Sequence, residues 1–135
     1  MLLIIEKVII LKSIKIFSEI SENDLLSLSS HLKEVEFETG HEVIKQGDMG
    51  TSMYIIAKGS VDVMINDNFI TSLGEKEVFG ELAALDPEPR SATVCTKEKT
   101  LLFKIENTVV YDLILEYPNV AKAIISILCQ RIRAK

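Results

Sequence analysis

The sequence predicts a mostly β protein with flanking helices, built around an antiparallel, jelly-roll-like β-roll. Short runs rich in β-branched and aromatic residues alternate with turn-forming residues at a spacing of about 8–12 residues, which is typical of sandwiches and rolled barrels. A helical apolar period precedes these runs, and another follows them to the end of the chain. With 135 residues, 47% of them hydrophobic, the chain can form one domain with its own core.

We therefore expect a single domain over residues 1–135. The N-terminal helices are expected over about residues 1–32 and the β-roll over about residues 35–106. Two C-terminal helices are expected over residues 107–135, where the apolar spacing returns to about 3.6 residues.

The N-terminal stretch MLLIIEKVIILKSIKIF predicts an amphipathic helix that ends near Lys12 and packs on the domain through Leu3, Val8 and Leu11. Charged residues interrupt it before it reaches the roughly 18–20 apolar residues of a membrane span, and it lacks the cleavage site of a signal peptide. We expect no membrane insertion. Farther along, Ser21 and the acid three residues later predict the start of a second helix, over about Glu22 to His31.

The strands are expected in the runs EVIKQ, SMYIIAKG, SVDVMIN and FITSL. VDVMIN, the dipeptide DN and FITSL together predict a hairpin. SATVCTKEKTLLFKI predicts two further strands joined by the exposed turn KEK. After Glu106, NTVVYDLILEY predicts a helix that ends at Pro118, and NVAKAIISILCQRIRAK predicts another.

The last helix carries an apolar stripe too wide for a single contact surface. Its members are Val120, Ala121, Ile124, Ile125, Ile127, Leu128 and Ile132. Such a stripe is expected to contact the β-roll together with either a partner chain or the mouth of a ligand site.

Composition excludes several classes of function. A net charge of -5 and a pI near 5.1 argue against direct binding of nucleic acid, which requires a basic surface. Cys95 and Cys129 form no CxxC pair, so we expect free thiols in a reducing compartment and a cytoplasmic protein. His31 and His41 form no H-x-H pair, so no metal site is expected. No nucleophile lies near a base in the sequence, so we expect no catalytic residues.

The segment FGELAALDPEPRSATV, residues 79–94, carries the strongest functional signal. Gly80 permits an unusual backbone turn before a short helical segment whose first N–H groups lack internal partners. Pro87 and Pro89 end that helix and return the chain, which brings Arg90 toward the helix start. Backbone N–H groups and a guanidinium together can bind a phosphate.

Glu81 and Arg90 allow two interpretations at this point. Glu81 repels a phosphate, so in a ligand site it would accept a hydrogen bond from a neutral hydroxyl of the same molecule, as in a compact nucleotide. Alternatively, the two side chains form a structural ion pair that closes a surface loop, as isolated ion pairs commonly do.

The same residues resemble the phosphate-binding cassette of the cyclic nucleotide-binding domain family. This family includes catabolite activator proteins, protein kinase A regulatory subunits and cyclic-nucleotide-gated channels. Phe79-Gly80-Glu81-Leu82-Ala83, six residues, then Arg90-Ser91-Ala92 matches the family pattern at the family's spacing. The stretches IKQGDMGTSMYIIAKGSVDV and LKSIKIFSEISENDL are also similar to the family, so the resemblance covers roughly the whole chain.

The resemblance implies a role for each cassette residue. Glu81 is expected to accept the ribose 2′-hydroxyl, and Arg90 to neutralise the cyclic phosphate. The expected ligand-binding residues are Gly80, Glu81, Leu82, Ala83, Arg90, Ser91 and Ala92, with the apolar side chains of Val63 and Leu73 facing the purine. The short helix is then a phosphate-cassette helix.

Ser91 after the arginine favours cAMP over cGMP as the ligand, because a threonine there is often associated with cGMP. Two positions depart from the family, in which the residues at Lys76 and Pro87 are often glycines. A lysine strains a turn that requires glycine, and a proline stiffens the loop. Neither change removes a group that contacts the ligand.

We therefore predict a regulatory module, and no enzyme, in which cyclic nucleotide binding repositions the C-terminal helices. Its output would pass to an effector domain or a partner protein, and the wide stripe of the last helix would support a homodimer. The alternative is a degenerate β-roll that serves protein interaction or dimerisation without binding a nucleotide.

Overall fold

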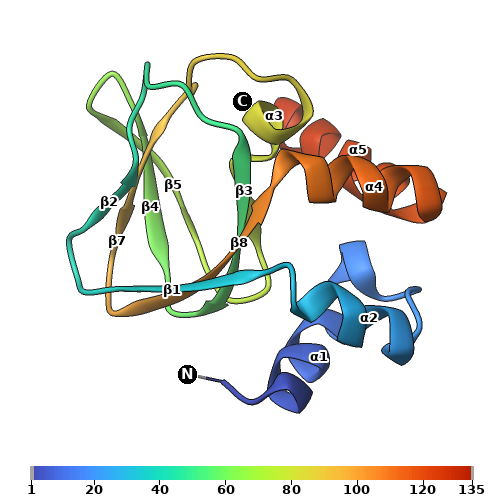
Figure 1. Cartoon of the computed structure of the whole chain (residues 1–135). Coiled ribbons are helices and arrows are strands. Elements are labelled where there is room, and N and C mark those ends of the chain that lie inside the picture. Colours follow the sequence, from blue (N-terminus) through green and yellow to red (C-terminus); the bar gives the residue numbers. More distant parts are fainter. Residues whose placement is uncertain (1, 135) are drawn as a thin grey trace. The chain divides into compact units, whose positions relative to one another are not determined.

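The computed structural model describes residues 2–134, and of Leu82 only the backbone (Figure 1). The strands are β1 (Lys33–Phe37), β2 (Glu42–Ile44), β3 (Ser52–Lys58), β4 (Val61–Ile65), β5 (Asn68–Leu73), β6 (Val78–Phe79), β7 (Thr93–Thr96) and β8 (Thr100–Glu106). Within the described residues they pair antiparallel in two four-stranded sheets, with the orders β1-β8-β3-β6 and β2-β7-β4-β5. The described residues also form five α-helices, which precede, interrupt and follow the strands along the chain. The predicted fold class, a mostly β, jelly-roll-like roll with flanking helices, is confirmed.

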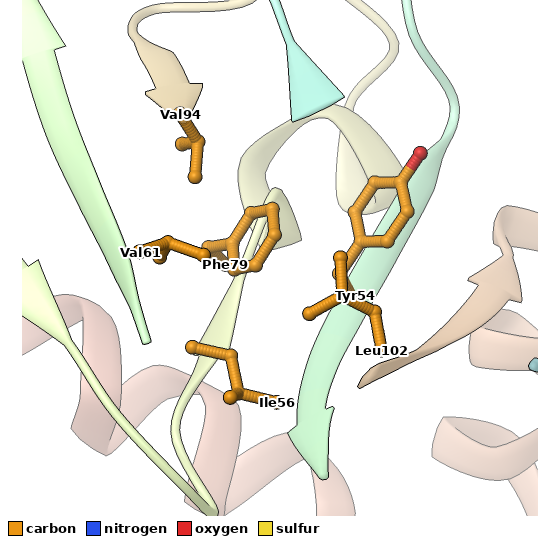
Figure 2. Close-up of a cluster of buried hydrophobic side chains, with 6 residues drawn as sticks. All are labelled: Tyr54, Ile56, Val61, Phe79, Val94 and Leu102. Atoms are coloured by element: carbon orange, nitrogen blue, oxygen red, sulfur yellow. The ribbon is translucent and has the colours of Figure 1, made fainter. Parts of the chain in front are cut away.

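Apolar side chains from both sheets form a cluster inside the roll (Figure 2). Its buried members are Tyr54, Ile56, Val61, Phe79, Val94 and Leu102. The rings of Tyr54 and Phe79 stack with their centroids 5.1 Å apart, a pairing that contributes about 0.5–1.5 kcal/mol beyond its buried area. In Figure 2 the Tyr54 hydroxyl points away from the other labelled side chains. One end of this ring therefore belongs to the core and the other to a polar region.

The hairpin between β4 and β5 forms as predicted, but its turn lies one residue earlier. Asn66 and Asp67 adopt positive φ angles of 53° and 65°, and Asn68 already pairs with Ile65. Two consecutive positive φ angles are the requirement of a two-residue type I′ turn, and Asn and Asp tolerate them better than most residues. The turn is therefore Asn66-Asp67 and not the predicted Asp67-Asn68.

The chain divides into two compact units, Leu32–Asn107 and Met1–His31 with Thr108–Lys135. The first is the β-roll together with α3 (Glu81–Leu85). The second is helical. Its elements are α1 (Ile4–Lys12), the 3₁₀ helix η1 (Lys15–Phe17), α2 (Glu22–Ser29), α4 (Asn107–Glu116) and α5 (Pro118–Arg133). No helix within residues 2–134 has the length and apolar character that spanning a membrane requires.

The helix ends follow the local sequence signals. The Ser21 side chain caps α2 by accepting a hydrogen bond from the Asp24 N–H at 3.2 Å, as predicted. Pro118 ends the preceding helix and is the first residue of α5, a position at which its missing N–H has no cost. One expectation was wrong: Leu3 precedes α1 and is 66% exposed, whereas Val8 and Leu11 are the buried residues of this helix.

Two side-chain hydrogen bonds connect the early helices to the start of α5 within the helical unit. The Tyr117 hydroxyl donates to Asp24, and the Asn119 amide donates to Glu19. The bond to Asp24 is the main cause that raises the pKa of Tyr117 to about 12. Ile16, Glu19 and Asn119 line two hollows in this unit, of about 300 Å³ and 110 Å³.

Candidate functional site

A left-handed glycine separates β6 from α3 and shapes the start of the candidate site. Gly80 has a φ of +80°. A Cβ at this position would lie 2.8 Å from Nη1 of Arg90 and 3.0 Å from the carbonyl oxygen of Ser52. Only glycine supplies both the backbone conformation and the space. The N–H of Ala84 then donates to the Gly80 carbonyl at 3.3 Å and begins the helical bonding of α3.

Arg90 lies where the sequence predicted, at the start of the cassette helix. Its Nη1 donates to the Gly80 carbonyl at 3.2 Å, and its Nη2 donates to the Ser52 carbonyl at 2.9 Å. The residue is only 8% exposed. Burial lowers the pKa of Arg90, and the nearby Tyr54, Glu106 and Glu81 act in the opposite direction. A guanidinium has five N–H donors, so these two bonds leave capacity for an anionic ligand.

A second loop holds the backbone of Arg90 from the other side. The N–H of Gly47 donates to the Arg90 carbonyl at 2.9 Å, and the N–H of Arg90 donates to the Asp48 carbonyl at 2.8 Å. Asp48 takes part in this contact through its backbone carbonyl. In the same loop, a Cβ on Gly50 would lie 2.3 Å from Nε of Arg90. Gly50 and Gly80 thus leave the space that the guanidinium occupies.

Glu81 is the first residue of α3 and is 3% exposed. Its charge is close enough to Arg90 to raise the pKa of the guanidinium. Both of the hydrogen bonds described for the Arg90 guanidinium end on backbone carbonyls. The cation and the carboxylate therefore both belong to one buried region at the beginning of α3.

The remaining predicted site residues are distributed between the cassette and the roll. Ala83 is buried in α3, Ser91 is exposed directly after Arg90, and Ala92 is half-buried. The side chain of Leu82 is outside the part of the chain that the structure describes. Val63 and Leu73 are half-buried and pack against the apolar cluster of the roll. They come from the paired strands β4 and β5, so they belong to the same sheet. Within the described residues, no hydrogen bond joins either of them to Arg90.

Sequence reasoning missed three residues around Arg90. Ser52 opens β3, and Glu106 ends β8 directly opposite it in the strand register. The Ser52 hydroxyl donates to Oε2 of Glu106 at 3.0 Å, while its carbonyl accepts from Arg90. Tyr54 is 8% exposed, and burial raises the pKa of its hydroxyl, with a further increase from Glu106. The one available signal was a serine and a glutamate at the ends of otherwise apolar strands.

The other candidate chemistries find no support in the part of the chain that the structure describes. His31 is exposed after α2, and His41 stacks on Phe37 with ring centroids 4.5 Å apart. Within residues 2–134 no three histidine, cysteine, aspartate or glutamate side chains are placed to hold a metal ion. Cys95 and Cys129 are free thiols, and burial raises the pKa of Cys95, which disfavours the reactive thiolate.

Comparison with known proteins agrees with this geometry. Residues 34–117, more than half of the chain, match the family described as "Cyclic nucleotide-binding domain". The chain is 40% identical over 85 residues to a cAMP-dependent protein kinase regulatory subunit of Debaryomyces hansenii, covering 63% of this chain and 19% of that protein. It is 27% identical over 123 residues to a CRP-like cAMP-activated global transcriptional regulator of Mycobacterium tuberculosis, covering 87% of this chain and 55% of that protein.

Among solved structures, the catabolite activator protein of Thermus thermophilus superposes with a TM-score of 0.79 and 27% identity. The match covers 88% of this chain and 58% of that one. The chain thus spans 55% of the Mycobacterium tuberculosis regulator, 58% of the Thermus thermophilus chain and 19% of the kinase regulatory subunit. The family match, the β-roll and the cassette around Arg90 agree: the chain belongs to the cyclic nucleotide-binding domain family.

Proposed function

We propose that this chain is a regulatory module that binds a cyclic nucleotide at α3 and Arg90, with cAMP preferred over cGMP. The observation that carries the proposal is the buried guanidinium, held in a space that Gly50 and Gly80 leave open. A buried cation is costly unless it has a partner. The backbone carbonyls supply only part of that partnership, and an anionic phosphate would complete it.

Each cassette residue has a chemical role in this proposal. Arg90 would bind the cyclic phosphate through its remaining N–H donors, each charge-assisted bond contributing about 1.5–3 kcal/mol. Backbone N–H groups of Ala83 and Ser91, with Gly80 and Leu82 close by, would complete the phosphate contacts. Glu81 would accept the ribose 2′-hydroxyl, since a carboxylate facing the phosphate would repel it.

The purine would lie against the roll, on Val63 and Leu73. Both side chains are half-buried at the edge of the apolar cluster, so each retains exposed apolar surface for a base. The preference for cAMP rests on Ser91, with Ala92 beside it, and on the names of the relatives, which describe a cAMP-activated regulator and a cAMP-dependent kinase subunit. No metal and no catalytic residue take part in the proposed function.

The proposed response is a repositioning of the C-terminal helices. A ligand shifts such an equilibrium only by its different affinity for the two arrangements. The apolar side chains of α5 that stay exposed, Ile125 at 58% and Ile132 at 69%, provide surface on which an alternative arrangement could pack. Amide hydrogen exchange of α5, compared with and without cAMP, measures this response. Identical protection in both states would contradict the repositioning.

Homodimerisation through α5 is the partner proposal that the exposed stripe supports. Ile125, Leu128 and Ile132 follow the 3–4 spacing of a two-helix seam, and none of them is fully buried. Ile132→Asp is expected to convert a dimer to a monomer in sedimentation experiments, whereas the same change at the exposed Gln130, outside the seam, is not. A wild-type monomer at high concentration would contradict the dimer.

The output would pass to an effector domain or a partner protein in the cytoplasm. The relatives are longer than this chain and have regulatory names, which supports a regulatory module over an enzyme. The free thiols Cys95 and Cys129 agree with a reducing compartment.

The alternative, an interaction module that binds no nucleotide, is favoured by one observation. The Arg90 guanidinium already bonds two carbonyls of its own chain, as a purely structural arginine would. In that case Arg90 would hold the start of α3 against β3, and added cyclic nucleotide would produce neither heat nor thermal stabilisation.

Calorimetric titration with cAMP, cGMP and linear AMP separates the two functions. We expect micromolar binding of cAMP, about 8 kcal/mol in free energy, weaker binding of cGMP and little binding of AMP. Arg90→Leu is expected to abolish binding. Because this change also removes two hydrogen bonds, Arg90→Lys serves as a second variant that keeps the charge but loses the fork, and it should bind with intermediate affinity. No heat from the wild-type protein at millimolar cAMP or cGMP would leave the interaction module as the function.

A further inference from the structure

Ser52 connects the guanidinium of Arg90 to the carboxylate of Glu106 through two hydrogen bonds. Ser52 and Glu106 are direct partners in the register of β3 and β8. The Ser52 hydroxyl donates to Oε2 of Glu106 at 3.0 Å, and the Ser52 carbonyl accepts from Nη2 of Arg90 at 2.9 Å. One residue, Ser52, therefore hydrogen-bonds both the carboxylate and the guanidinium.

The medium between these two charges screens them poorly. Ser52 is 5% exposed and Arg90 is 8% exposed, so little water lies between them. Charges interact several times more strongly across such a region than across water. The same field reaches Tyr54, since Glu106 raises the pKa of both Arg90 and Tyr54. The Glu106 side chain is itself 53% exposed, which keeps the interaction moderate.

Lys104 opposes the charge of Glu106 from the same strand. Its Nζ lies 3.7 Å from Oε1 of Glu106, and its side chain is 31% exposed. Glu106 therefore uses one oxygen for Ser52 and the other for Lys104. The electrostatic potential at Arg90 depends on both residues. Removing the charge of Glu106 makes it more positive, and removing the charge of Lys104 makes it more negative.

A phosphate that binds Arg90 carries the same sign of charge as Glu106. Glu106 is therefore unfavourable to the bound anion, while it stabilises the guanidinium when no anion is present. The hydrogen bond from Ser52 to Glu106 is not needed to place the carbonyl that Arg90 binds, because the β3–β8 ladder already fixes the Ser52 backbone. Charge and hydrogen bonding can thus be separated by a glutamine, which keeps the acceptor and removes the charge.

We propose that Glu106 is an affinity-setting residue that competes electrostatically with the phosphate for Arg90 and holds nucleotide affinity below the value that the cassette alone would give. The proposal rests on the proposed function and assigns a role to a residue outside the cassette. Lys104 tunes this competition by partly neutralising Glu106.

Calorimetry with cAMP in physiological salt tests the proposal. Glu106→Gln is expected to tighten cAMP binding by about two- to fivefold, and Lys104→Gln to weaken it by about twofold. Both differences should shrink at high salt, where exposed charges are screened. A merely structural role would make both changes neutral or weakening. Glu106→Gln binding that is unchanged or weaker than wild type would overturn the proposal.

The control is Glu36→Gln on β1. This glutamate is also half-exposed and paired with a lysine, Lys99, at 3.5 Å. It lies opposite Leu101, five residues along β8 from Glu106, or about 16 Å at the rise of a strand, which is beyond the screening length in physiological salt. Its removal changes the net charge equally and is expected to leave cAMP affinity unchanged. If Glu36→Gln tightens cAMP binding as much as Glu106→Gln does, the effect is one of net charge and the proposal is overturned.

A nucleotide-free measurement separates failure of this inference from failure of the proposed function. The titration of Tyr54, followed by NMR of ¹³C-labelled tyrosine, reports the field of Glu106 inside the roll. A nearby negative charge raises a tyrosine pKa, so Glu106→Gln should lower the pKa of Tyr54 and Lys104→Gln should raise it. If cAMP does not bind but the pKa of Tyr54 shifts in the variants, only the proposed function is rejected. If the wild-type protein binds cAMP but Glu106→Gln changes neither the pKa of Tyr54 nor the cAMP affinity, only the role of Glu106 is rejected.

Discussion

The β-roll and the helical unit differ in the charge they bury and in the amount of apolar surface they expose. The roll buries two charged side chains: Glu81 and Arg90 are 3% and 8% exposed. The roll also exposes Met49, Phe69 and Ile70 by more than half, and a larger set of apolar side chains is exposed in the helical unit. Those above half exposure there are Leu3, Ile4, Ile5, Ile9, Leu115, Ile125 and Ile132. Burial of charge and exposure of apolar surface both cost free energy, so each unit retains a feature that folding alone does not favour.

In the proposed function, this difference separates ligand recognition by the roll from the response of the helices. The buried charges of the roll are held by strand ladders, by the left-handed backbone at Gly80 and by the space that Gly50 leaves beside the Arg90 side chain. Such a site is organised before a ligand arrives, which reduces the entropic cost of binding. The helices carry surface that remains available for another contact. We therefore expect mutations in the roll to change affinity, and mutations on the exposed face of α5 to change assembly or response.

The difference between the two units requires that the helical unit have a buried core of its own. Ile124 is 2% exposed and its neighbour Ile125 is 58% exposed. Ile124→Ala is expected to lower the free energy of unfolding by about 3 kcal/mol, because it leaves a cavity. Ile125→Ala, the matched control, should cost less than about 0.5 kcal/mol. Urea unfolding measures both, and equal losses would mean that α5 has no distinct buried face.

A glycine substitution sharpens the other half of the comparison. Gly50→Ala would place a methyl group 2.3 Å from Nε of Arg90, so the guanidinium must move. We expect a loss of about 2 kcal/mol in unfolding free energy and at least a tenfold loss of cAMP affinity. In Gly74→Ala, the control, no heavy atom lies within 4 Å of the new methyl group. That variant should keep affinity and stability, and parallel losses in both variants would contradict the crowding at Arg90.

Lys76 tests whether the roll bears backbone strain near the cassette. It has a φ of 73° in the turn before β6, and its N–H donates to the Ile56 carbonyl at 2.8 Å. Lys76→Gly is expected to raise the free energy of unfolding by about 0.5–1 kcal/mol, since glycine adopts this conformation without the cost that an L-residue has. Glu75→Gly, next to it and without a positive φ, should lower stability by a similar amount. Thermal denaturation that places both variants below wild type would exclude strain at Lys76.

The smallest effect concerns the bond between Tyr117 and Asp24 in the helical unit. The pKa of Tyr117 is raised to about 12 in the folded protein from its ordinary value of 10.0. The folded state therefore holds the proton more tightly, so the stabilisation is complete below about pH 10 and is lost as the pH rises through about 12. The stability difference between wild type and Tyr117→Phe should shrink over this range in denaturant unfolding. A difference that is constant with pH would show that the hydroxyl bond does not contribute.

Much of the fold followed from local patterns. The strand runs, the Ser21 cap and the break at Pro118 each depend on neighbours within about four residues. The hairpin turn was displaced by one residue, because the positive φ angles fall on Asn66 and Asp67, and three successive polar residues do not identify which two form the turn. Leu3 was wrongly placed in the first helix for a similar reason, since an apolar residue before a helix start has the same spacing as one inside it.

The cassette could be predicted for the same physical reason. Gly80, Glu81 and Arg90 lie within one short segment, where the dihedral freedom of glycine and the stiffness of proline determine how the chain returns. The ligand roles of these residues, including the purine contacts of Val63 and Leu73, stay predictions.

The amino-acid sequence by itself determined the β-roll with its flanking helices, the local shape of the cassette and the family to which that cassette belongs. Only the tertiary structure decided what surrounds the guanidinium. Ser52 is 38 positions from Arg90, and the hydrogen bond from Ser52 to Glu106 spans 54 positions. Residues so far apart meet because strands pair in a register set by burial of the whole core, and no local preference of either residue specifies its partner.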